Sequence, residues 1–216
     1  MYILSKTKNL ILKTVTIFLL LVVIKSYSQT KELDLIAKQL FVDMNNRDFD
    51  AIVEATYPKV FETVSKEQMK VFIKSVFEGN DQMSIEIPKM IPDYKLSKVF
   101  KESKDNLEYA FISYDMKMKM TFNGLEFDDE KKKMMTGIMK AKGMNVKFSS
   151  NNSMDVLMKD RVTILLRDDL TNNKWKMMNY DPDSPLFYQM TPTALIEAGK
   201  KYKQDLLLES KKNSEK

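Results

Sequence analysis

Asp160 is the acidic residue whose position best suits general-base chemistry. On the strand predicted around it, the even positions share one face: Met154, Val156, Met158, Asp160, Val162, Ile164 and Leu166. A carboxylate held on such an apolar face is desolvated, so its pKa rises and it can accept a proton from a substrate. In a second interpretation, Lys159, Asp160 and Arg161 form a turn or bulge between two shorter strands, with Asp160 in water. We favour the turn or bulge.

Four aromatic residues are candidates for lining an apolar ligand pocket and supplying it with hydrogen-bonding groups. They are Tyr57, Tyr114, Trp175 and Tyr180. The simpler interpretation, which we favour, makes them core residues whose polar tips reach the surface or a backbone partner. Tyr114 is the best placed of the four for a ligand, because its strand phase puts it on the covered face.

Met116, Met118 and Met120 alternate along one predicted strand and offer thioether sulfurs. Clustered thioethers suit Cu(I), a soft ion. The same residues also fit the apolar half of a strand, where Met fills irregular gaps in a core. Lys117 and Lys119 lie between them and add positive charge, which disfavours a cation. We therefore predict no cofactor and no metal.

The chain contains no His and no Cys among its 216 residues. This absence excludes thiol nucleophiles, imidazole acid–base catalysis, and zinc or iron sites built on Cys and His. Any catalysis must use Asp, Glu, Lys, Tyr, Ser or Thr.

Residues 1–28 have the order of a secretory signal peptide: Lys residues, then an apolar run over 15–24, then the small residues around Ser28. We predict cleavage after Ser28, export to the periplasm or the exterior, and no membrane attachment afterwards. The segment holds four of the 35 basic residues and no acidic one, which leaves 31 basic against 30 acidic residues. Such a nearly neutral chain is not expected to bind nucleic acid.

The hydrophobic periodicity and the capping residues predict the secondary structure. Asp48 is expected to cap a short helix that stops by Tyr57, and Ser65 with Gln68 forms a capping box. Helices are expected over 31–46, 48–57, 65–79, 128–142 and 191–209. Strands are expected over 83–87, 96–101, 108–122, 144–148, 155–166 and 174–180.

This order of elements predicts an α+β fold in which the N-terminal helices pack on a curved antiparallel sheet, with an inserted helix and a C-terminal helix. The expected divisions are a signal peptide at 1–28, an α+β cone-like domain at 29–192, and a C-terminal helix and charged tail at 193–216. On strand 108–122, Ile112 should face the core and Ser113 the solvent. Ile112→Asp should therefore destabilise the fold far more than Ser113→Asp.

Two segments carry a resemblance to a known family. They are Arg47-Asp48-Phe49-Asp50 to Tyr57-Pro58, after a long amphipathic helix, and Lys174-Trp175-Lys176-Met177-Met178. The chain resembles the nuclear-transport-factor-two-like superfamily, in particular its secreted bacterial members. That superfamily includes isomerases, dehydratases, polyketide cyclases and non-catalytic binding modules, so the resemblance implies a fold and leaves the function open. None of its catalytic motifs matches this chain residue by residue.

The sequence is best interpreted as an exported, non-catalytic binding or interaction module. Its partner would be a small apolar ligand or another protein, and the chain would act as a monomer or a homodimer. The alternative is a small isomerase or dehydratase in which Asp160 is the base and Tyr114 donates a hydrogen bond to a developing oxyanion. Copper binding through the Met residues is a third possibility.

Overall fold

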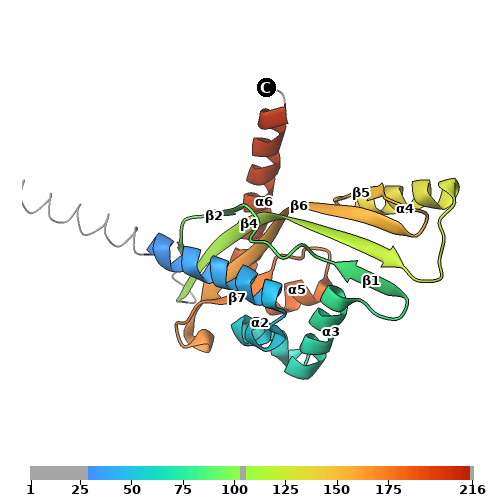
Figure 1. The fold of residues 1–216 in the computed structure, drawn as a ribbon. Coiled ribbons are helices and arrows are strands. Elements are labelled where there is room, and N and C mark those ends of the chain that lie inside the picture. Colours follow the sequence, from blue (N-terminus) through green and yellow to red (C-terminus); the bar gives the residue numbers. More distant parts are fainter. Residues whose placement is uncertain (1–28, 103–105, 215–216) are drawn as a thin grey trace, which may run out of the picture.

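The computed structural model describes residues 29–102 and 106–214 (Figure 1). The predicted signal peptide at 1–28 lies outside these residues. Within them, no helix combines the length and the apolar character that crossing a membrane requires.

A seven-stranded antiparallel sheet forms the centre of the fold, and the predicted α+β class is confirmed. Two long strands, β4 (Leu107–Phe122) and β6 (Ser153–Arg167), pair along most of their length. The short strands flank them: β1 (Met83–Glu86), β2 (Tyr94–Leu96) and β3 (Phe100–Glu102) pair with β4, whereas β5 (Met144–Phe148) and β7 (Lys176–Asn179) pair with β6. The single strand expected over 96–101 is therefore two separate strands.

The helices begin where capping residues predict them. Asp48 caps α2 (Phe49–Ala55), and the capping box of Ser65 and Gln68 opens α3 (Lys66–Glu78). Asp128 caps the inserted helix α4 (Asp129–Ala141). Further helices are a first helix at 29–46, here called helix 29–46, then α5 (Pro185–Met190) and α6 (Thr193–Ser214), with 3-10 turns at Pro58–Glu62 and Asp169–Thr171. The sequence did not predict α5, and α6 continues past its expected end.

Helices cover both faces of the sheet along the first half of β4. On one face, Leu33, Ala37 and Phe41 of helix 29–46 pack against Ala110, Ile112 and Tyr114. On the other face, Leu195 and Leu206 of α6 and Phe187 of α5 join Phe111 and Ile164 in a second core. The expectation that this half of β4 has a solvent face is therefore wrong. Figure 1 shows helix 29–46 lying across the sheet, and the C-terminal part of α6 extending away from the rest of the fold.

Ser113 illustrates that correction. It is only 4% exposed, and its Oγ lies 3.1 Å from Oη of Tyr202 on α6. One turn before Tyr202, α6 packs closely on the Tyr180 ring because Gly199 has no side chain: a Cβ at that position would come within 2.6 Å of the ring. In the second half of β4 the expected alternation holds, since Lys117 and Lys119 are exposed and Met116 and Met118 are half-buried.

A β-bulge at Asp160 divides β6 into two phases. Tyr114 pairs with Arg161, but Met116 pairs with Met158, so β6 has one extra residue at this point. Asp160 takes the left-handed conformation, with φ of 50°. Val162, Ile164 and Leu166 therefore face α6, whereas Met154, Val156 and Met158 lie on the opposite face. The interpretation that placed Asp160 in phase with one apolar row is wrong, and the bulge is confirmed, although Asp160 is half-buried and not fully in water.

Candidate functional site

A pocket lies where the edge of β4 loses its strand partner. Strand β2 pairs with β4 up to Tyr114, and β1 pairs with it only from Lys119 onward. Between these two residues, the connection over 87–93 departs from the sheet. The space at this gap is a pocket of about 620 Å³, here called the edge pocket.

Apolar side chains from distant parts of the chain line the edge pocket. They are Phe41 and Met44 of helix 29–46, Phe77 of α3, Met90 of the connection, and Tyr114 and Met116 of β4. The Phe41 ring meets the Tyr114 ring edge-on, with centroids 5.0 Å apart, and contacts the Tyr94 ring at 5.5 Å. Such a mostly apolar concavity has the size and the lining that small-molecule sites use.

Arg47 brings a cation to the same pocket. It follows helix 29–46 in the left-handed conformation, with φ of 59°, and it is half-buried. Its guanidinium lies over the Phe77 ring, 4.8 Å from the centroid, and Nη1 donates to the Met44 carbonyl at 2.9 Å. Arg47 therefore both closes the helix and lines the pocket.

The two tyrosines of the pocket differ in their hydroxyl groups. Tyr94 Oη donates to Asp34 of helix 29–46, and burial together with this bond raises the pKa of Tyr94 to about 12. The Tyr94 hydroxyl is thus committed to the fold. Tyr114 is 8% exposed, and its hydroxyl has no hydrogen-bond partner in the part of the chain that the structure describes.

Asp160 also borders the edge pocket, but on the α6 side of the sheet. Its backbone N–H donates to Oδ1 of Asp115 at 3.0 Å, and its carbonyl accepts a hydrogen bond from Lys203 of α6. Burial lowers the pKa of Lys203, against the opposing effect of the Asp160 charge. Asp160 also interacts electrostatically with Lys95 and Tyr202. Tyr114 packs against Phe41 on the face of helix 29–46, so the two residues border the pocket from different faces of the sheet.

The other predicted aromatic residues lie away from the edge pocket. Tyr57 and Tyr180 belong to the core beneath α5 and α6. Trp175 packs on the face of helix 29–46, where the guanidinium of Arg167 lies 4.6 Å from its ring centroid. Of the four aromatic candidates, only Tyr114 lines the edge pocket.

The three methionines lie on one face of β4, opposite Met158, Val156 and Met154 of β6. Met116 lines the edge pocket, and Met118 lines a second groove of about 650 Å³ between β1 and β5. That groove opens onto the charged side of the sheet, where Lys119 pairs in register with Glu86 and Asp155. Over residues 29–102 and 106–214, no group of three or more His, Cys, Asp or Glu is arranged to hold a metal ion.

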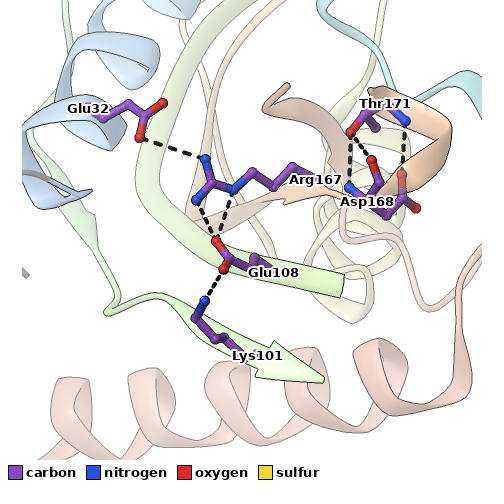
Figure 2. A network of polar contacts seen from close by, with 6 residues as sticks. All are labelled: Glu32, Lys101, Glu108, Arg167, Asp168 and Thr171. Atoms are coloured by element: carbon purple, nitrogen blue, oxygen red, sulfur yellow. Dashed lines mark hydrogen bonds and ion pairs between the residues drawn. The ribbon is translucent and has the colours of Figure 1, made fainter. Parts of the chain in front are cut away.

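A polar network surrounds Glu108 at the N-terminal end of β4, away from the edge pocket (Figure 2). Nε and Nη2 of Arg167 donate to Oε2 of Glu108 at 2.9 and 2.5 Å, and Lys101 binds the other oxygen. Burial acts to raise the pKa of Glu108, but the hydrogen bonds and charges of Lys101 and Arg167 outweigh it and lower that pKa. Arg167 also lies 3.9 Å from Glu32 of helix 29–46. These contacts join β3, β4, β6 and helix 29–46, which is a structural role.

Beside this network, Asp168 connects β6 to the segment after α2. Its Oδ1 accepts from Thr171 N at 3.0 Å and its Oδ2 accepts from Tyr57 Oη at 2.6 Å. Burial and then the bond to Asp168 raise the pKa of Tyr57. Tyr57 is thus a buried anchor of the fold and has no free hydroxyl to offer a ligand.

Sequence reasoning missed most of the edge pocket. From the sequence, Phe41 and Met44 fall only within the helix expected over 31–46, and Arg47 falls only within a segment of the family resemblance. The left-handed conformation of Arg47 has no signal in the sequence, because non-Gly residues adopt it only in particular contexts.

Comparisons of the chain with protein-family models, with curated proteins and with solved structures found no match.

Proposed function

We propose that this protein is an exported, non-catalytic binding module that takes a small, largely apolar ligand into the edge pocket. The observation that carries the proposal is the pocket itself: about 620 Å³, with walls of aromatic, Met and other apolar side chains and with polar groups at its border. Membership of the nuclear-transport-factor-two-like superfamily remains a prediction, and the proposal does not depend on it.

The polar groups of the pocket support binding rather than catalysis. A general base must reach the proton that it removes, and it must do so together with a group that stabilises the developing charge. Asp115 accepts a backbone hydrogen bond, and Asp160 lies on the α6 side of the sheet, away from Tyr114. The pocket therefore supplies shape and apolar surface, and no hydrogen bond within residues 29–102 and 106–214 joins Asp160 to Tyr114.

Filling the edge pocket should abolish binding. Met116→Trp places a bulky ring on the pocket wall, so we expect it to remove the fluorescence increase that the native chain produces with Nile red, a neutral apolar dye. Met134→Trp on α4 is the matched control, since Met134 is exposed and lies outside the pocket. Both variants contain the same N-terminal segment, so dye binding to that segment cancels in the comparison.

A thermal melt followed by circular dichroism should show that Met116→Trp still folds, since overpacking costs about 1 to 3 kcal/mol. If folded Met116→Trp binds Nile red as well as Met134→Trp does, the edge pocket is not the binding site.

Export is tested separately. The order of residues 1–28 predicts removal of this segment, so protein recovered from outside the cytoplasm should begin at or near Gln29. N-terminal analysis or intact-mass measurement distinguishes this outcome from a chain that still begins at Met1 and stays in the cell, which would overturn export.

A further inference from the structure

Arg47 is a half-buried cation without an acidic partner. The described part of the chain places no carboxylate within ion-pair distance of it, and of its five N–H donors one is used, by the Met44 carbonyl. Arg cannot lose its charge in a protein, and partial burial of that charge is unfavourable. The nearby C-terminus of helix 29–46 offsets part of this cost. The remaining donors are available to a ligand in the edge pocket.

Tyr114 adds a second unused donor. Buried Tyr hydroxyl groups usually find a partner, yet this one has none within residues 29–102 and 106–214. Its oxygen is not among the fully enclosed polar atoms of the structure, so a ligand in the pocket can reach it.

The carboxylates around the pocket do not neutralise these donors. Asp115 accepts the backbone N–H of Asp160, and Asp160 lies near Lys203 and Lys95 on the α6 side. Asp93 is exposed on the rim. The edge pocket therefore combines apolar walls with a guanidinium that has further N–H donors to offer and a hydroxyl that lacks an acceptor.

We infer that the ligand of the edge pocket is an amphipathic carboxylate, an apolar chain that ends in an anionic carboxyl group. This inference rests on the proposed function and specifies its ligand class. The apolar chain would lie against Phe41, Met90 and Met116, and the carboxylate would accept hydrogen bonds from Arg47 and Tyr114. Guanidinium binds carboxylates with paired, charge-assisted hydrogen bonds, which gives this head group an advantage over an alcohol of the same chain length.

The test compares decanoate, decanol and decylammonium as competitors of Nile red on the native full chain, at neutral pH and below micelle-forming concentrations. Decanoate should bind about tenfold or more tightly than decanol, as one or two charge-assisted hydrogen bonds require. Decylammonium should bind more weakly than decanol. Arg47→Gln and Tyr114→Phe should each weaken decanoate binding more than decanol binding, and so reduce the preference for decanoate.

Lys74→Gln is the control, because it removes one positive charge from α3 at an exposed position outside the pocket. Native protein that binds decanol as tightly as decanoate would overturn the ligand class and leave the proposed function intact. If no competitor displaces Nile red, both the ligand class and the proposed function are wrong. A preference for decanoate that survives in both Arg47→Gln and Tyr114→Phe would overturn the assignment of the two donors. If Arg47→Gln does not fold, the Tyr114→Phe variant and the comparison of decanoate with decanol on the native protein still test the ligand class.

Discussion

Replacing Ile112 by Asp is expected to lower the free energy of unfolding by about 3 to 5 kcal/mol, the cost of an uncompensated buried charge. Ile112 is fully buried, with 0% exposure, in the core between β4 and helix 29–46. Its neighbours across the sheet are Leu96 and Thr163, and neither carries a positive charge to compensate a carboxylate. Urea unfolding followed by circular dichroism measures the change.

The neighbouring substitution Ser113→Asp should also be costly, in contrast to the mild effect expected from sequence alone. Because α6 covers Ser113 and Tyr202 contacts its hydroxyl, an Asp at this position should cost about 2 kcal/mol or more. Lys117→Asp, further along the same side of β4 and exposed, should cost less than about 1 kcal/mol. If Ser113→Asp proves as mild as Lys117→Asp, α6 does not cover this face in solution.

Asp168→Ala should be similarly destabilising, by about 3 to 5 kcal/mol. Asp168 is 9% exposed and Tyr57 is 1% exposed, so removal of the carboxylate leaves the Tyr57 hydroxyl buried without its acceptor. The backbone N–H of Thr171 also loses its cap. Urea unfolding of the single variants, of Tyr57→Phe and of the double variant gives the coupling energy between the two side chains.

Asp169→Ala is the matched control for Asp168→Ala. Asp169 is exposed, and within residues 29–102 and 106–214 its side chain binds only Asn106, so its loss should cost less than about 1 kcal/mol. Equal costs for the two substitutions, or a coupling energy near zero between Tyr57 and Asp168, would show that this buried bond does not stabilise the fold.

The edges of the helices were predictable from sequence because capping is local. Asp48 accepts from the backbone N–H of Ala51, and Ser65 exchanges hydrogen bonds with Gln68. Each partner lies within one helical turn of the cap, so the sequence alone contains the whole interaction. The α+β class followed from the same kind of information, since the hydrophobic period changes from helical to alternating along the chain.

The faces of the central strands were not predictable in the same way. A strand covered on both sides has apolar residues in both phases, so alternation no longer distinguishes core from solvent. The sequence around Phe111 and Ser113 fits either arrangement until α6 is placed on the sheet. The bulge at Asp160 then changes the phase of β6, and a one-residue shift exchanges the two faces of a strand.

By itself, the sequence determined which chemistries are absent, through the lack of His and Cys, and where most of the helices and strands lie. Only the tertiary structure decided which polar groups are buried as partners and which are free. Tyr57 and Asp168 are 111 positions apart in the chain, and Arg47, Phe77 and Tyr114 meet at one pocket. The physical reason is that local hydrogen bonds and periodicity act over a few residues, whereas a pocket depends on long-range packing that brings distant segments together.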